Sequence, residues 1–162
     1  MKILILYFSM SGRTKKVAEK MASDLKSSEV VIERLKYTKK QRNLMFEEDK
    51  IKKGDLSNFK FNETILDLEP YDLIILGSPT YGSLPTVAFN GYIENVRNIK
   101  GKSLILFNTC RLISIKTFRV LEAEIGKKGG KVVKKQVFKG FFKIGMRRVE
   151  KFIDEINQDF LK

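Results

Sequence analysis

Three hydroxyl side chains lie within six residues, directly after the first apolar run of the chain. The residues are Ser9, Met10, Ser11, Gly12, Arg13 and Thr14, and a helical pattern follows them. The first N–H groups of a helix lack partners and carry partial positive charge, which suits a phosphate. Gly12 lets the backbone curl closely around an anion. The loop therefore fits a phosphate monoester held mainly by neutral donors, or equally well an ordinary turn in which Ser or Thr caps a helix.

Several other kinds of site are excluded. The loop has neither the GxxxxGK[ST] spacing of a P-loop nor the GxGxxG of a dinucleotide turn. The chain has no histidine, which excludes Ser-His-Asp and Cys-His catalysis and the usual zinc sites. Cys110 is the only cysteine, so there is no internal disulfide and no CxxC metal site. A redox role for Cys110 would need a resolving partner, and a small buried apolar residue is the favoured interpretation.

The elements that would position the loop alternate between strand and helix patterns. We predict strands at 2–8, 29–35, 72–76, 102–107 and 131–138, and helices at 14–26, 86–96, 114–125 and 146–161. Alternation of this kind implies right-handed crossovers and a parallel sheet. We therefore expect an α/β fold: a doubly wound, five-stranded parallel sheet with helices on both faces, in a single domain over residues 1–162. Residues 36–62 are polar and basic, with Leu44-Met45-Phe46 as their only apolar cluster, and are predicted as a broken helix or a mobile loop.

A second loop follows the third predicted strand and reads Ser78-Pro79-Thr80-Tyr81-Gly82. In doubly wound folds ligands bind at the carboxyl ends of the strands, so this loop lies where a ring attached to the phosphate would reach. Tyr81 offers a flat apolar face for stacking. Taken alone, an aromatic residue in a loop is more often part of the packing.

Together the two loops, SMSGRT and SPTYG, resemble those of the flavodoxin family, and the resemblance covers nearly the whole chain in strand order and length. It implies a flavodoxin-like fold with strand order 2-1-3-4-5 and flavin mononucleotide (FMN) as the cofactor. By this resemblance, the FMN phosphate would be surrounded by Ser9, Met10, Ser11, Gly12, Arg13 and Thr14. The isoalloxazine would lie along Pro79, Thr80, Tyr81 and Gly82. A backbone carbonyl near Gly82–Ser83 would meet flavin N5–H in the reduced states.

The third loop, Asn108–Ile113, departs from the family pattern because it has no aromatic residue to cover the second face of the ring. Asn108, Thr109 and Cys110 are still expected to contact the flavin pyrimidine through backbone N–H groups. Phe141 or Phe142, after the fifth predicted strand, would be a substitute for the missing aromatic, although core packing is the favoured role for both.

The formal charge of +13 is unevenly spread: residues 127–151 hold ten Lys/Arg and one acid. We expect a redox partner protein with an acidic docking surface. No nucleic acid partner is expected, because the basic stretch lacks interleaved exposed aromatics. No apolar run is long enough to cross a bilayer, so we expect a cytoplasmic protein, with peripheral contact to an anionic surface left open.

Three functions remain in competition. An FMN electron carrier between redox partners, moving one or two electrons, is favoured over a turnover enzyme. The alternative is an FMN-dependent oxidoreductase, such as a quinone or protoporphyrinogen dehydrogenase of flavodoxin type. That alternative would need residues 36–62 to shape a substrate pocket. A cofactor-free module that binds nucleic acid or lipid ranks last.

Overall fold

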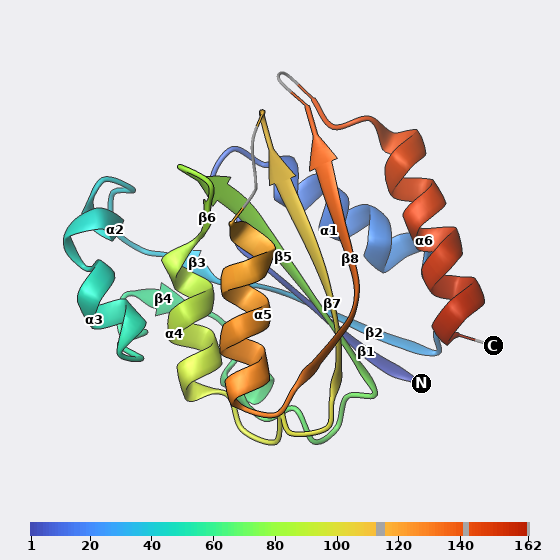
Figure 1. Ribbon diagram of the computed structural model, residues 1–162, viewed down its shortest axis with the longest axis horizontal. Helices are drawn as coiled ribbons and strands as arrows, with labels where there is room; N and C mark the ends of the chain where they lie inside the picture. The colour runs from blue at the N-terminus through green and yellow to red at the C-terminus, as the bar shows by residue number, and fades with distance from the viewer. Residues whose placement is uncertain (113–115, 141–142, 162) are drawn as a thin grey trace.

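A parallel sheet with the strand order β2-β1-β5-β7-β8 runs through the centre of the structure (Figure 1). The computed structural model describes residues 1–112, 116–140 and 143–161. The strands are β1 (Lys2–Tyr7), β2 (Glu29–Arg34), β5 (Leu73–Tyr81), β7 (Ser103–Cys110) and β8 (Lys131–Lys139). Numbered along the chain, these five strands lie in the order 2-1-3-4-5. The predicted doubly wound α/β fold is confirmed.

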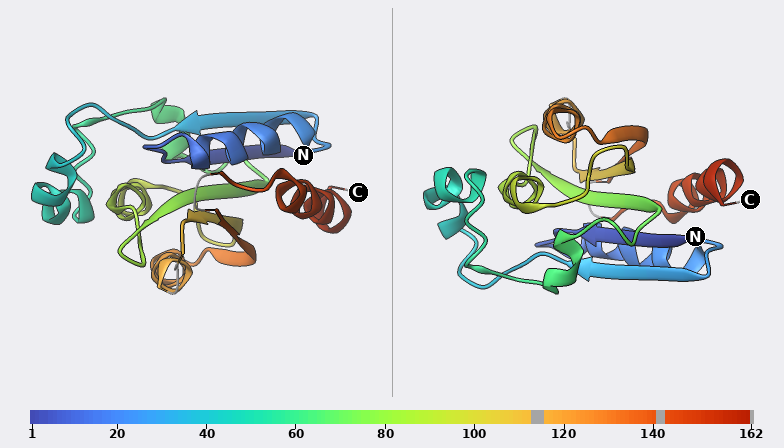
Figure 2. Two further views of the ribbon diagram at one scale, coloured as in Figure 1. Left: turned by 90° about the horizontal axis from the view of Figure 1, so that it is seen from above. Right: turned by 90° about the horizontal axis from the view of Figure 1, so that it is seen from below.

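Helices cover both faces of the sheet. α1 (Arg13–Asp24) and α6 (Met146–Phe160) pack on one face, and α4 (Val87–Asn95) and α5 (Thr117–Lys127) pack on the other (Figure 2). The central strand β1 buries alternate side chains in the two cores: Ile3, Ile5 and Tyr7 in one, and Leu4 and Leu6 in the other. A strand that is buried on both faces reads as one continuous apolar run, which is why β1 is visible in the sequence.

Two strands run further than the apolar pattern indicates. The ladder between β5 and β7 continues past Gly77 and Phe107 to the pairs Ser78–Asn108 and Pro79–Thr109. The strands predicted at 72–76 and 102–107 therefore end too early, since β5 and β7 continue to Tyr81 and Cys110. Most of the SPTYG segment and all of Asn108–Cys110 are strand rather than loop, because backbone pairing continues where the apolar side chains stop.

β5 ends in a tight hairpin with β6 (Leu84–Pro85). The two residues of the turn, Gly82 and Ser83, have φ angles of 53° and 72°. Positive φ at both central positions is the requirement of a type I′ turn, whose twist suits a two-residue hairpin. Thr86 then caps α4, with its Oγ1 accepting a hydrogen bond from the N–H of Ala88 at 3.4 Å.

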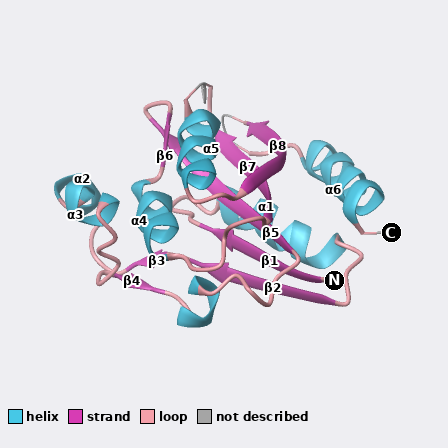
Figure 3. Cartoon of the chain, turned by 60° about the horizontal axis from the view of Figure 1, so that its bottom comes forward, coloured by secondary structure: helices cyan, strands magenta, loops and turns pink. Residues whose placement is uncertain are grey.

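The segment between β2 and β5 is built of short elements, of which α2 (Asn43–Phe46) and α3 (Glu48–Lys52) lie beside α4 (Figure 3). It contains β3 (Lys36–Tyr37) paired with β4 (Phe59–Lys60), the short helices α2 and α3, and a 3₁₀ turn at Glu63–Leu66. The prediction of a broken helix here is confirmed, whereas the two short strands were not predicted. Two-residue strands carry no periodic signal in the sequence.

No helix in the described ranges is long and apolar enough to cross a bilayer. The described residues also hold no group of three or more side chains that would bind a metal ion. The predicted start of the third helix at Ser114, together with Ile113, Phe141 and Phe142, lies outside the described residues.

Candidate functional site

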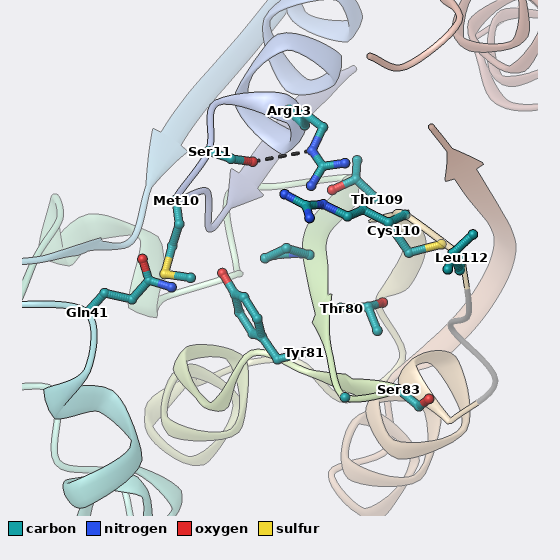
Figure 4. Close-up of a pocket in the computed structure, with 13 residues that line it drawn as sticks. Met10, Ser11, Arg13, Gln41, Thr80, Tyr81, Ser83, Thr109, Cys110 and Leu112 are labelled. Carbon is teal, nitrogen blue, oxygen red and sulfur yellow. Dashed lines mark hydrogen bonds between the residues drawn. The ribbon is translucent and has the colours of Figure 1, made fainter. Parts of the chain in front are cut away.

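A cavity of about 560 Å³ opens at the carboxyl ends of β1, β5 and β7 (Figure 4). This is the edge of a doubly wound sheet at which ligands bind. The residues that line the cavity are Met10, Ser11, Arg13, Gln41, Pro79, Thr80, Tyr81, Gly82, Ser83, Thr109, Cys110, Arg111 and Leu112. Its volume falls within the ordinary range of small-molecule sites.

The loop between β1 and α1 presents a helix start that no described side chain caps. α1 begins after Gly12, whose φ of 84° lies in the left-handed region, and no side-chain hydrogen bond caps the helix. There is also no acidic residue in its first turn. The capped-turn interpretation of the sequence is therefore wrong, and the uncapped N–H groups with their dipole favour an anion.

Ser9 supplies a second observation at this loop that fits the binding of an anion. Its side chain is buried, yet Ser9 Oγ has no hydrogen-bond partner among the described residues. Buried hydroxyls are normally paired, because an unpaired one loses its hydrogen bonds to water without replacement. An incoming phosphate oxygen is the kind of group that would satisfy it.

Two arginines fix the backbone of the loop. Arg34 on β2 donates a hydrogen bond from Nη2 to the carbonyl of Ser9 at 2.6 Å. Arg13 donates from Nη1 to the carbonyl of Gly140 at 2.8 Å and from Nε to Ser11 Oγ at 3.3 Å (Figure 4). The loop is thus tied to β2 on one side and to the end of β8 on the other.

Two predicted site residues, one at the start of a helix and one at the end of a strand, bind each other. Thr14 Oγ1 and Thr109 Oγ1 lie 2.8 Å apart and share a hydrogen bond, and both side chains are buried. This contact joins the first turn of α1 to the end of β7. It links the loop after β1 directly to the loop expected to meet the flavin ring, as assigned from the sequence.

Asn108 acts inside the sheet rather than in the cavity. Its side chain is fully buried; Nδ2 donates to the carbonyl of Ser78 at 2.8 Å, and Oδ1 accepts from Thr80 Oγ1 at 2.9 Å. These bonds hold the polar ends of β5 and β7 together. Asn108 is therefore placed to orient Thr80, which lines the cavity.

Tyr81 provides the aromatic wall of the cavity. Its side chain is 37% exposed. Burial of the hydroxyl raises the pKa of Tyr81 above its ordinary value of 10.0, and the opposing effect of Arg13 is smaller. The phenol is therefore neutral at physiological pH, and the ring is available for stacking on a flat ligand.

Most of the predicted site residues come together at this cavity, but four of them do not line it. Gly12 lines a neighbouring cavity, Ser9 lies beneath the loop beside Arg34, and Thr14 and Asn108 are buried behind the wall. Sequence reasoning missed Gln41 as a lining residue, and it named Arg111 and Leu112 only as members of the third loop. Ser83 was expected to contribute only through a backbone carbonyl, and Gln41 lies in the segment without periodicity.

The surroundings of the cavity are positively charged. Arg13 and Arg111 line it, and no carboxylate does so among the described residues. A neighbouring cavity of about 750 Å³, at the start of α1 and α6, adds Lys15, Lys16 and Lys143 against Glu19. This field would favour a ligand or partner that carries negative charge.

Comparisons with known proteins agree with the fold described above. The family model described as flavodoxin matches residues 2–143. Among solved structures, oxidised Flavodoxin 2 from Bacillus cereus is similar with a TM-score of 0.66 and 22% identity, covering 99% of this chain and 100% of that one. A flavoprotein from Lactobacillus acidophilus, solved in complex with FMN, is similar with a TM-score of 0.65 and 24% identity, covering 84% of this chain and 92% of that one. No curated protein sequence matches the chain.

Proposed function

The chain belongs to the flavodoxin family, and on that basis we propose that it binds FMN in the cavity at the ends of β1, β5 and β7 and carries electrons between redox partners. The observation that carries this proposal is the loop Ser9–Thr14, with its uncapped helix start and the unpartnered hydroxyl of Ser9. The complex of the L. acidophilus flavoprotein with FMN supports the choice of cofactor.

The residues present fit the two ends of FMN. The phosphate would be held by the N–H groups at the start of α1 and by the hydroxyls of Ser9 and Ser11, with Arg13 nearby. The isoalloxazine would lie in the cavity beside Tyr81 and the hairpin turn Gly82–Ser83. Thr109 and Cys110, at the end of β7, would border the pyrimidine edge of the ring. When bound, FMN supplies the electron chemistry, and the protein positions and tunes it.

The second face of the ring would meet Arg111 and Leu112, which extend the cavity beyond β7. Both side chains are exposed. An apolar side chain and a cation at this position provide cover without an aromatic residue, and the cation would favour the reduced, anionic form of the cofactor.

We further propose that the electron-transfer partner has an acidic docking surface. The cations beside the cavity openings are the feature that supports it: Lys15, Lys16 and Arg111 are exposed at the edge of the sheet where FMN would bind. Complementary charge would steer the partner towards the edge of the sheet where the flavin would be bound.

Parallel titrations of the apoprotein with FMN and with riboflavin, which lacks the phosphate, test the cofactor assignment. Binding should quench flavin fluorescence at one FMN per chain, and riboflavin should bind at least tenfold more weakly. Ser9→Ala should weaken FMN binding roughly tenfold and leave riboflavin binding unchanged, because a hydrogen bond to a charged group contributes about 1.5–3 kcal/mol.

Ser28→Ala is the matched control, since Ser28 lies between α1 and β2 at the opposite edge of the sheet. Equal affinities for FMN and riboflavin would show that the Ser9–Thr14 loop is not the phosphate site.

A further inference from the structure

A chain of hydroxyl and amide groups runs behind the wall of the proposed FMN cavity, from the end of β7 to the turn of the β5–β6 hairpin. Asn108 Nδ2 donates to the carbonyl of Ser78 at 2.8 Å, and Thr80 Oγ1 donates to Asn108 Oδ1 at 2.9 Å. Thr80 Oγ1 lies 3.0 Å from Thr117 Oγ1, which in turn lies 3.3 Å from the carbonyl of Ser83. Thr80 and Ser83 line the cavity (Figure 4), whereas Thr117 lies behind it as the first residue of α5. Contact with FMN therefore does not explain the place of Thr117 in this chain.

The direction of each bond follows from the carbonyl of Ser78. A carbonyl only accepts, so the amide nitrogen of Asn108 must face it and the amide oxygen of Asn108 must face Thr80. That oxygen also only accepts, so the hydroxyl proton of Thr80 is committed to Asn108. In the contact between the two threonines, Thr80 is therefore the acceptor and Thr117 is the donor.

Thr117 consequently has one hydroxyl proton and two acceptors within reach. The proton can go to Thr80 Oγ1 at 3.0 Å or to the Ser83 carbonyl at 3.3 Å, but not fully to both. The contact with Ser83 is longer than an ordinary O–H···O hydrogen bond, so it is the weaker of the two. The Thr117 side chain is fully buried, so bulk water does not act as a third partner.

The turn to which this weak bond leads is itself strained. Ser83 has a φ angle of 72°, in the left-handed region, which residues other than glycine adopt at a cost. The hairpin ladder pairs Thr80 with Pro85 and Tyr81 with Leu84, and it stops at the turn. The bond from Thr117 thus ties a strained part of the cavity wall to α5.

From this competition we propose that Thr117 positions the Gly82–Ser83 turn, and that Thr80 weakens this hold by accepting the same proton. The redox meaning of the arrangement rests on the proposed function, in which the turn borders the flavin. The Ser83 carbonyl can turn towards the N5–H group of a reduced flavin without leaving the Thr117 hydroxyl unpaired, because Thr80 accepts the proton instead. The pair of threonines therefore lowers the cost of moving this carbonyl.

In the apoprotein, the test is the chemical shift of the Ser83 carbonyl carbon, measured by NMR, which moves downfield as the carbonyl accepts a stronger hydrogen bond. Thr80→Val removes the competing acceptor, so Thr117 should donate fully to Ser83 and the signal should move downfield. Thr117→Val removes the donor, so the signal should move upfield. Thr117→Ser keeps the hydroxyl and should restore the parent shift.

In the FMN-loaded protein, the test is the ratio of the affinities for reduced and oxidised FMN, obtained from the midpoint potentials of bound and free FMN. Thr117→Val should raise this ratio about threefold by freeing the Ser83 carbonyl, and Thr80→Val should lower it about threefold, as expected for one neutral hydrogen bond. Thr38→Val is the matched control: it removes a bond from a threonine hydroxyl to the carbonyl of Asn58 and does not line the cavity. It should change neither measurement.

The opposite signs at Thr80 and Thr117 are the decisive result, because general loosening of the hairpin would move the Ser83 signal in the same direction in both valine variants. Movement in one direction, no movement, or failure of Thr117→Ser to restore the parent shift would overturn the inference. Opposite movements with an unchanged affinity ratio would overturn the redox role. Failure of FMN to bind would defeat the proposed function, while the measurements on the apoprotein would still decide whether Thr117 positions the turn.

Discussion

Arg34 and Ser9 meet beneath the loop Ser9–Thr14, and each has a buried polar atom without a partner among the described residues. In the described part of the chain, Ser9 Oγ and Arg34 Nε are the buried side-chain polar atoms that lack a hydrogen-bond partner. The two residues are joined through the bond from Arg34 Nη2 to the Ser9 carbonyl. An unsatisfied buried group in a folded protein needs an explanation, and a ligand at this loop provides one for Ser9. Arg34 then acts as a positioning residue, since it contacts the loop backbone and not the cavity.

This role predicts the effect of Arg34→Met. The substitution keeps much of the side-chain volume but removes the donor to Ser9, so the loop should lose its fixed backbone and FMN affinity should fall about tenfold. That loss corresponds to about 1.4 kcal/mol. Fluorescence titration measures it, with riboflavin as the second ligand.

Arg97→Met is the control, because Arg97 is exposed and lies at the other end of the sheet beside Asp67. Removal of Arg97 tests whether the loss of any positive charge is enough to weaken FMN binding. If both variants weakened FMN binding equally, the effect would be electrostatic and Arg34 would have no positioning role.

Single residues differ in how far the sequence alone reveals their roles. SMSGRT and SPTYG were visible because their residue types and their positions after apolar runs are local properties. Asn108 was taken for a loop residue, since nothing local shows that its amide bonds to Ser78 and Thr80 across the sheet. Gln41 reaches the cavity only through tertiary packing of a segment without a periodic pattern.

Among the elements, the layer formed by β3, α2, α3 and β4 depends on one carboxylate. Glu47 interacts with Tyr37, Lys39 and Asn58, with Asn58 Nδ2 at 3.2 and 3.1 Å from its two oxygens. Hydrogen bonds from Lys39, then from Tyr37, lower the pKa of Glu47 below its usual 4.5. Burial, followed by the bond to Glu47, raises the pKa of Tyr37 to about 12, which keeps this donor protonated.

A lowered carboxylate pKa predicts a defined dependence of stability on pH. The stabilisation by Glu47 is present at pH values above the pKa of the unfolded chain and is lost as the pH falls below about 4.5, through the lower pKa of the folded state. Glu47→Gln should therefore be less stable than the parent at pH 7, and the difference between the two should shrink towards pH 3.

Urea unfolding at several pH values measures this difference. Glu63→Gln, the same change at an exposed position in the following 3₁₀ turn, should leave the pH profile unchanged. A gap between Glu47→Gln and the parent that stays constant with pH would show that Glu47 acts through packing rather than charge.

The long elements were the predictable ones, because burial imposes continuous apolar runs on strands and amphipathic stripes on helices. α6, for example, begins at the predicted Met146. The ends of β5 and β7 were not predictable in the same way, since polar side chains there continue the ladder. The order of the strands followed from the alternation of elements together with the family resemblance.

At the scale of the whole molecule, the net charge of +13 favours the approach of acidic proteins. We expect the association rate of the FMN-loaded protein with an acidic redox partner to fall at least tenfold between low ionic strength and ~0.5 M salt. Stopped-flow mixing with an acidic electron-transfer protein measures this rate.

The position of the charge can be tested separately from its amount. The double variant Lys15→Glu/Lys16→Glu reverses charge at the start of α1, beside the site. Lys127→Glu/Lys131→Glu makes the same change in net charge at the end of α5 and the start of β8, the opposite edge of the sheet. Only the first should slow association strongly. Equal slowing would mean that net charge acts without a defined docking face.

The central place of β1 also constrains the order in which the protein is made. β1 pairs with β2 on one side, but its other partner, β5, begins only at Leu73. The N–H of Phe8, just before the loop Ser9–Thr14, donates a hydrogen bond to the carbonyl of Gly77 on β5 at 3.1 Å. A ribosome that has released β1 must therefore synthesise some seventy further residues before the loop gains its support, and more than a hundred before Thr109 reaches Thr14. Because a chain emerges over seconds, the nascent protein passes through a period with no complete site. We therefore expect cofactor uptake to follow the synthesis of β7 rather than to guide the folding of β1.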